Sequence, residues 1–321
     1  MVTPPIEQST RPAPGSAARP SRVRDGGRRG GPRRRERWYA YGFLSPGVVG
    51  LTVFTLFPVA MAVVMSLYHW PIFGERSFLG LGNFRYLLLE DPGFLVSVRN
   101  TFVFTALFLP LNVVLSLALA FWISNSRWQQ LFRVLFFIPA ITPMVVNAVI
   151  WKMLYQPQGV IAHYLDSWFG ITAPNFLADS GTAMISVVVM SVWQGIGYNL
   201  VVFSAAIDQL PRSVLEAAEI DGARGLTKFL RVQLPLMSPA VFFVTTMTMI
   251  TSMQVFTQTY ILTRGGPGDS TVTMVQNVYE NGFVSRDLGV AAAGAWLLFA
   301  VILLITAVQF LGQKRWVHYE H

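Results

Sequence analysis

The sequence predicts an all-α integral membrane protein with about six transmembrane helices. Of its 321 residues, 53% are hydrophobic and only 12% are charged, whereas soluble domains carry about 25% charged residues. Six apolar stretches are each long enough to cross a bilayer core, which needs about 20 helical residues. The chain contains no cysteine, which excludes disulfides, thiolate metal sites and cysteine nucleophiles.

The six apolar stretches are the expected spans, and a cytoplasmic helix-turn-helix is expected between the fourth and the fifth. They cover residues 42–67, 101–123, 131–155, 183–207, 239–263 and 289–311. None of them contains Asp, Glu or His, and their only basic residues are Arg133 and Lys152, near the ends of the third. Carboxylates inside spans are typical of ion-coupled transporters, so energy for any transport is expected from outside the membrane.

The N-terminal segment differs from the rest of the chain. Residues 1–37 hold ten arginines against three acidic residues, with few large apolar side chains. Such a segment cannot bury enough surface to offset its ordering entropy. We therefore expect a disordered tail before a permease domain at residues 38–321. The tail is too polar and too long for a signal peptide.

The distribution of basic residues predicts the orientation. With the N-terminus inside, the cytoplasmic side carries 18 Lys and Arg and the opposite side 6, as the positive-inside rule requires. Both termini are then expected in the cytoplasm, and the tail carries most of this difference. An arm for nucleic acid or lipid headgroups is the alternative interpretation of the tail; we expect a solvated tail and no nucleic-acid partner.

No enzymatic motif occurs in the sequence. It lacks a G-x-x-x-x-G-K-[ST] phosphate loop, an H-E-x-x-H zinc motif and a G-x-S-x-G nucleophile elbow. The four histidines, His69, His163, His318 and His321, are scattered over loops and the C-terminal end. We expect no catalysis, no metal site and no cofactor bound by this chain.

The loop at residues 208–238 carries the most specific pattern. Pro211 suits the first turn of a helix, and Gly222 suits a helix end with a left-handed residue. A second helix is expected over residues 223–232, with Pro235 and Pro239 stopping it and restarting the chain into the fifth span. Small side chains are rimmed by four charges of each sign, which suits docking into another protein's groove. An ordinary amphipathic connector is the alternative.

The same loop resembles the coupling loop of permeases in ATP-binding-cassette importers. The family pattern is Glu-Ala-Ala-x-x-Asp-Gly-Ala followed by Leu-Pro about a dozen residues on. Here it matches Glu216, Ala217, Ala218, Asp221, Gly222, Ala223, Leu234 and Pro235. Further likenesses are Gly80-Leu81-Gly82-Asn83-Phe84, Asn100-Thr101 and Thr263-Arg264-Gly265-Gly266-Pro267. Together they are similar to the carbohydrate and glycerol-3-phosphate branch, and in particular to its larger maltose-type permease.

The resemblance implies a subunit of a complex in the bacterial cell membrane. The chain would form a heterodimer with a second permease, together with two ATPase subunits that bind ATP and magnesium, an extracytoplasmic solute-binding protein and membrane lipid. Glu216 would pair with a basic residue of the ATPase, and Gly222 would make the turn. Leu234 and Pro235 would orient the return to the membrane. ATPase closure would then drive hinge-type alternating access.

Polar and aromatic residues in three spans are candidates for the solute pathway, because sugar sites need hydrogen-bonding groups and flat apolar faces. The candidates are Asn147, Trp151, Gly195, Tyr198, Asn199, Thr251, Gln254 and Gln258. The resemblance favours Gly195, Tyr198, Thr251 and Gln254, and a shift by one residue in the fifth span would bring in Ser252. Any of them could instead serve helix packing.

The charge pattern bears on the solute and on the competing function. No cluster of Lys or Arg lines these spans, whereas a phosphorylated solute would require one. A neutral sugar is therefore favoured over glycerol-3-phosphate. A secondary transporter or facilitator for a small polar solute is the alternative, and the missing carboxylates argue against it.

Overall fold

The computed structural model describes residues 34–124 and 126–316, so most of the predicted tail lies outside the described residues. The chain divides into two compact units, and the boundary between them in the sequence falls between Leu56 and Phe57. The first comprises α1 (Arg34–Leu51) and a π-helical segment, η1 (Thr52–Leu56). Helix α1 continues through Pro46.

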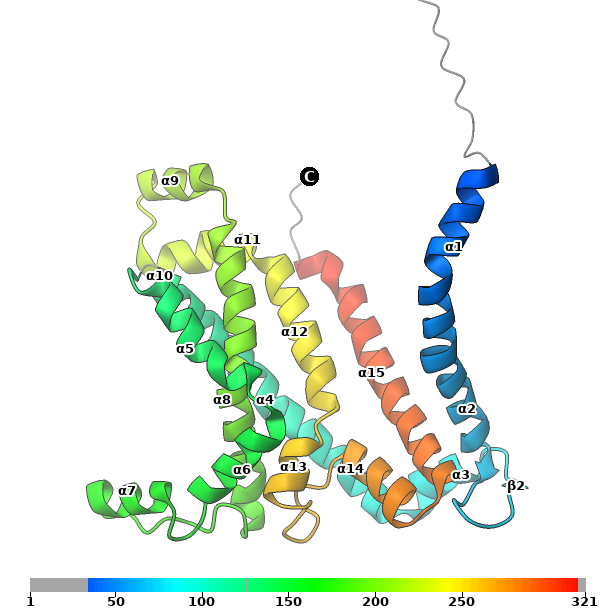
Figure 1. Cartoon of the computed structure of the whole chain (residues 1–321). Coiled ribbons are helices and arrows are strands. Elements are labelled where there is room, and N and C mark those ends of the chain that lie inside the picture. The colour runs from blue at the N-terminus through cyan, green and yellow to red at the C-terminus, as the bar shows by residue number, and fades with distance from the viewer. Residues whose placement is uncertain (1–33, 125, 317–321) are drawn as a thin grey trace, which may run out of the picture. The chain divides into compact units, whose positions relative to one another are not determined.

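The second unit is almost entirely helical (Figure 1). Its longer helices are α2 (Phe57–Ser66), α4 (Pro92–Ser124), α5 (Gln129–Ile141), α6 (Met144–Leu154), α7 (Val160–Phe169), α8 (Ser180–Asp208), α12 (Ser238–Met253) and α15 (Leu288–Trp316). Shorter ones are α3 (Gly82–Arg85), η2 (Tyr86–Glu90), α9 (Arg212–Ile220), α10 (Gly225–Lys228), η3 (Phe229–Gln233), α11 (Leu234–Leu236), α13 (Thr257–Leu262), α14 (Met274–Tyr279) and η4 (Glu280–Val284). Strands β1 (Tyr68–His69) and β2 (Ser77–Phe78) pair antiparallel, with Tyr68 opposite Phe78.

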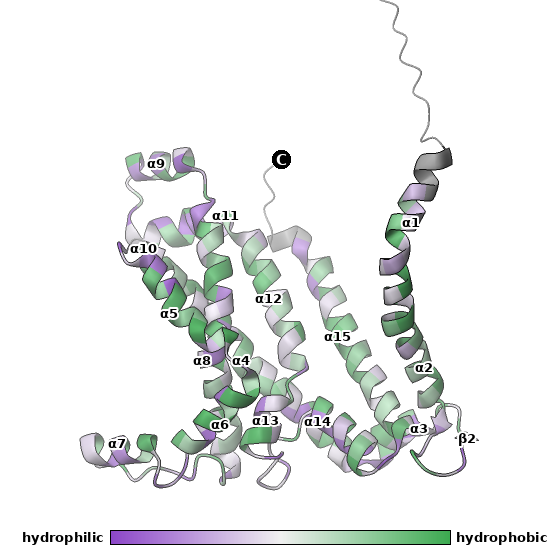
Figure 2. Ribbon diagram, in the orientation of Figure 1, coloured by the Kyte–Doolittle hydropathy of each residue, from purple (hydrophilic) through white to green (hydrophobic). Residues whose placement is uncertain are grey.

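The helices fit the predicted number of spans. Four are long and apolar enough to cross a membrane, Tyr39–Ser66, Pro92–Ser124, Ser180–Asp208 and Leu288–Gln313, and two bent helix pairs raise the number to six if each pair is one span. Figure 2 shows hydrophobic residues along these helices and more hydrophilic ones in α9 and the connecting loops. The predicted all-α membrane fold is therefore confirmed.

The third and fifth predicted spans are not straight helices. Helices α5 and α6 meet at 93°, because Pro143 holds the preceding Thr142 in an extended conformation. The side-chain amide of Asn147 donates to the carbonyls of Pro139 (2.9 Å) and Thr142 (3.3 Å), which satisfies acceptors freed by the bend. In the fifth, α12 ends at Met253 and α13 is a separate short helix.

Close packing of α4, α5 and α8 fixes the wall of the bundle. A Cβ at Gly197 of α8 would overlap the carbonyl oxygen of Phe136 in α5, so only glycine permits this approach. Buried apolar side chains fill the remaining space, among them Phe104, Val187, Met190, Leu200 and Phe203. The side chains that line the cavity described below therefore come largely from tightly packed helices.

Candidate functional site

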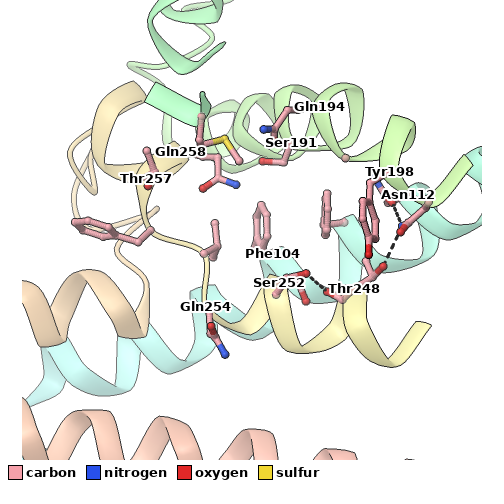
Figure 3. Close-up of a pocket in the computed structure, with 17 residues that line it drawn as sticks. Phe104, Asn112, Ser191, Gln194, Tyr198, Thr248, Ser252, Gln254, Thr257 and Gln258 are labelled. Carbon is pink, nitrogen blue, oxygen red and sulfur yellow. Dashed lines mark hydrogen bonds between the residues drawn. The ribbon is translucent and has the colours of Figure 1, made fainter. Parts of the chain in front are cut away.

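A cavity of about 450 Å³ lies between α4, α8 and the break that separates α12 from α13 (Figure 3). Aromatic side chains and uncharged polar groups form its walls. The lining residues are Phe104, Phe108, Asn112, Met144, Ser191, Gln194, Gly195, Tyr198, Asn199, Thr248, Thr251, Ser252, Gln254, Val255, Phe256, Thr257 and Gln258. None of them is charged, so the cavity offers hydrogen bonds without a fixed charge.

Six of the eight predicted pathway residues line this cavity: Gly195, Tyr198, Asn199, Thr251, Gln254 and Gln258. Ser252, the neighbour predicted for a shifted register, lines it too. Asn147 and Trp151 do not belong to the lining. Asn147 is buried at the α5–α6 bend, as described above, and Trp151 packs against Tyr155 and Trp193.

One end of the cavity is closed by a buried polar cluster that joins three helices. The amide of Asn199 in α8 donates to the side-chain oxygens of Asn112 in α4 and Thr248 in α12, the latter at 3.0 Å. Asn112 donates in turn to the carbonyl of Val192 at 3.4 Å. The side chains of Asn112, Asn199 and Thr248 are all buried. Because their polar groups are satisfied by one another, they fix the relative positions of these helices.

Gly195 lies beside this cluster. A Cβ there would meet the Asn112 amide nitrogen at 2.7 Å and the ring of Phe108 at 3.3 Å. The glycine therefore leaves room for the α4 side chains that line the cavity.

Some other lining side chains have no hydrogen-bond partner within the described part of the chain. Among the described residues, the amides of Gln194, Gln254 and Gln258 have no hydrogen-bond partner, and Tyr198 is 52% exposed. Figure 3 shows Gln258 and Ser191 facing the space between α8 and α12, and Gln254 directed away from Gln258. The hydroxyl of Thr251 donates to the carbonyl of Met247 at 3.0 Å, so its oxygen can still accept.

The sequence reasoning missed the contribution of α4. Phe104, Phe108 and Asn112 lie on one face of this helix at four-residue spacing. Asn112 is the only side-chain amide in the apolar stretch 101–123. A single amide in an apolar span was the sequence feature that could have identified it as a cavity residue.

The coupling segment, residues 208–238, connects α8 to α12 and contains α9, α10, η3 and α11. Helix α9 spans Arg212–Ile220 after Pro211, as predicted. Gly222 has φ +82, and the N–H of Ala223 donates to the carbonyl of Ala218 at 2.9 Å, which closes the helix end.

The predicted bounds of the second helix, residues 223–232, are wrong, because Pro235 does not stop it; the chain does restart at Ser238 and Pro239. A continuous helical segment runs from Gly225 to Leu236 and meets α12 at 75°. Pro235 falls at the start of α11, directly after the π-helical segment η3. The missing N–H of proline therefore falls where the hydrogen-bond pattern changes from π-helical to α-helical, and the chain bends only at Met237, which is buried.

One ion pair joins the two helices of the coupling segment. Lys228 donates to Glu219 at 2.7 Å. This hydrogen bond, followed by the charge of Lys228, holds the pKa of the Glu219 carboxyl below its ordinary value. The pair links α10 to α9, and its contribution to stability is small because Glu219 is exposed.

The outer face of the coupling segment has no partner within the described residues. Glu216 and Ala217 are exposed, and Glu216 makes no hydrogen bond or ion pair. Ile220 is 86% and Leu226 64% exposed. Exposed apolar side chains beside an unpaired carboxylate indicate an interface with another protein.

Several candidate spans, an uncharged polar cavity and an exposed helical segment at one end are together typical of a transport permease. Residues 99–317 match the family model described as binding-protein-dependent transport system inner membrane component. The chain belongs to this family: it is a multi-pass membrane permease subunit of an ATP-binding-cassette importer. It is not itself an ATPase, and ATP is bound by a partner subunit.

Similar proteins support this membership over nearly the whole chain. A probable ABC transporter permease protein, YesP of Bacillus subtilis (strain 168), is 30% identical over 292 residues, which cover 89% of this chain and 94% of that protein. The sn-glycerol-3-phosphate transport system permease protein UgpA of Pectobacterium atrosepticum is 34% identical over 290 residues, covering 89% and 97%. Because the family depends on a binding protein, the secondary-transporter alternative is rejected.

A solved structure shares the fold. It is a bacterial alginate ABC transporter in complex with an alginate pentasaccharide-bound periplasmic protein. The match has a TM-score of 0.77 at 20% identity and covers 88% of this chain and 96% of the matched chain.

Proposed function

We propose that this chain forms one half of a translocation pathway for a neutral saccharide and that the cavity between α4, α8 and α12 contacts the solute. The observation that supports this most is the composition of the cavity wall. Amides, hydroxyls and aromatic rings line it, and none of its lining residues is charged. Neutral sugars pair with such groups and stack their apolar faces on rings.

In this proposal the cavity has two kinds of wall. The cluster of Asn112, Asn199 and Thr248 sets the shape of the site, because its hydrogen bonds are made within the protein. Transient contacts with the passing solute come from Gln194, Gln258 and Tyr198. The second half of the wall comes from a second permease, and a solute-binding protein delivers the solute at the α7 end.

The proposed coupling route begins at α9. We propose that α9 docks into a cleft of a cytoplasmic ATPase, that Glu216 pairs with a basic side chain there, and that two ATPase subunits serve the permease pair. The rigid turn at Gly222 and the Glu219–Lys228 pair transmit movement of α9 to the segment Gly225–Leu236 and so to α12. This orientation places both chain termini in the cytoplasm of a bacterial cell, as the arginine distribution favours.

sn-Glycerol-3-phosphate is the second candidate, because UgpA is a glycerol-3-phosphate permease protein by name and is 34% identical to this chain. A phosphate with about two negative charges needs Arg or Lys, and the wall of this half-cavity has neither.

A transport assay separates the two solutes. The complete transporter is reconstituted in proteoliposomes with its binding protein, and ATP-driven uptake of radiolabelled neutral oligosaccharides is compared with that of sn-glycerol-3-phosphate. We expect saccharide uptake that Gln258→Ala reduces. Uptake of glycerol-3-phosphate alone, unaffected by Gln258→Ala, would refute the proposal.

A further inference from the structure

A second hollow lies on another face of α4, at the end of the bundle that carries α7. We call it the α4–α8 groove; it has a volume of about 640 Å³. Helices α4 and α8 form its sides, and the loop before α14 closes its rim. The residues used below are Arg99, Val103, Leu107, Ile185, Asp269 and Ser270. None of them lines the polar cavity.

The rim of the groove holds polar groups without partners. Arg99 is exposed and makes no hydrogen bond or ion pair with any described residue. Asp269, which is exposed, also lines the groove, and the structure records no ion pair between it and Arg99. The hydroxyl of Ser270 is buried and has no hydrogen-bond partner. The rim thus carries an exposed cation, Arg99, and an exposed anion, Asp269, neither of which has an ion-pair partner among the described residues.

The rim has a fixed geometry. The buried side-chain amide of Asn100 donates to the carbonyls of Asp269 (2.7 Å) and Val272 (3.0 Å), which fastens the loop to α4. These hydrogen bonds keep Asp269 next to α4, the helix that carries Arg99.

The groove changes from polar to apolar along α4 and α8. Arg99 lies two residues before the apolar stretch 101–123, and Val103 and Leu107 follow on the same helix face one and two turns further in. On α8, Ser180 and Gly181 precede the stretch 183–207, and Ile185 lies one turn deeper. Val103, Leu107 and Ile185 are all partly exposed. On both helices, therefore, the residues that line the groove change from polar to apolar in the same direction.

We propose that the α4–α8 groove binds one phosphatidylethanolamine molecule. The lipid phosphate lies at the Arg99 guanidinium, its ammonium group at the Asp269 carboxylate, and one acyl chain along Val103, Leu107 and Ile185. A headgroup with both charges satisfies both unpaired side chains, which an anionic lipid alone would not. A free phosphate ion would leave the apolar part of the groove empty. The inference does not depend on the identity of the transported solute.

Retention of lipid by the purified complete transporter tests the proposal. Nanodiscs are prepared from equal amounts of phosphatidylethanolamine, phosphatidylglycerol and phosphatidylcholine, and bound lipid is measured by native mass spectrometry. We expect selective retention of phosphatidylethanolamine. Arg99→Gln should lower it about tenfold or more, since a charge-assisted hydrogen bond is lost. Asp269→Asn should remove the preference over phosphatidylglycerol. Arg286→Gln, an exposed arginine outside the groove, should change neither.

A second measurement identifies what covers the groove in the assembled complex. Since the chain has no cysteine, Ile185→Cys gives a single labelling site on it for a bimane fluorophore. A nitroxide on the acyl chain of phosphatidylethanolamine should quench this fluorophore, and less so when Arg99→Gln is added. Absence of quenching would show that protein covers the groove. That result, or equal lipid retention by the wild type and Arg99→Gln, would overturn the proposal.

Discussion

The cavity wall and the coupling segment satisfy their polar groups in opposite ways. At the closed end of the cavity, Asn112, Asn199 and Thr248 bond to one another and are buried. On the coupling segment, Glu216 is exposed without a partner beside the exposed Ile220. The first arrangement is complete within one chain, whereas the second needs another protein. Substitutions in the two regions should therefore fail in different assays.

The largest expected effect is at Glu216. Glu216→Lys reverses the charge that the proposed ATPase cleft receives, and breaking such a pair costs about 2–5 kcal/mol, which is about 30-fold or more in association. ATP-driven uptake should be lost while the amount of inserted protein is unchanged. Co-purification of the ATPase and uptake into proteoliposomes measure the two effects.

Glu75→Lys is the matched control for Glu216→Lys. It makes the same charge change on an exposed glutamate in the loop between the two strands, and it should leave uptake and ATPase binding unchanged. Normal uptake by Glu216→Lys would show that Glu216 needs no partner protein and that α9 does not couple the ATPase to transport.

The next largest effect is expected within the packed wall. Gly197→Ala forces a Cβ into the carbonyl oxygen of Phe136, and overpacking of this kind costs about 1–3 kcal/mol. The midpoint of thermal unfolding in detergent should fall. Gly312→Ala, on α15 with no atom within 4 Å of the added Cβ, should leave the midpoint unchanged or raise it slightly.

A third test compares satisfied and free amides inside the same cavity. Asn199→Leu removes the donor to the buried side-chain oxygens of Asn112 and Thr248, so it should destabilise the protein by about 1–3 kcal/mol. Gln258→Ala removes a side chain with no partner, so it should leave stability within about 0.5 kcal/mol. It should instead reduce the rate of saccharide uptake about 2- to 12-fold, the value of one neutral hydrogen bond.

Unfolding midpoints and uptake rates, measured on the same preparations, separate the two variants. A stable Asn199→Leu protein would show that the buried cluster does not hold the helices together. An unstable Gln258→Ala protein would show that Gln258 has a packing role instead of a solute contact.

The same contrast explains what the sequence could predict. The coupling segment is local in sequence, so the positions of α9 and the turn at Gly222 follow from Pro211, the small residues and the glycine itself. The cavity is formed by segments far apart in the chain. The polar residues of α8 could be identified, but the role of Asn112 depends on how α4 crosses α8, which periodicity does not show.

The bends in the third and fifth spans also escaped prediction for a physical reason. Hydropathy measures only the length of an apolar run, and both runs are long enough to span. Whether proline ends a helix depends on its neighbours. Pro143 does so in the third span because Thr142 is extended, whereas Pro235, in the coupling loop before the fifth span, is accommodated behind a π-helical segment.

The smallest expected effect concerns the ion pair within the coupling segment. Because the pKa of Glu219 is lowered in the folded protein, its contribution to stability is present above the ordinary glutamate pKa of 4.5 and is lost as the pH falls through the lowered value. Glu219→Gln should therefore increase amide hydrogen exchange in α9 and α10 near neutral pH, and the difference from the wild type should vanish in acid. The change should be small because Glu219 is exposed to solvent. A difference that persists after the wild-type carboxyl is protonated would show that the substituted amide disturbs packing instead of removing a charge, and the coupling segment would then resemble the internally satisfied cavity wall.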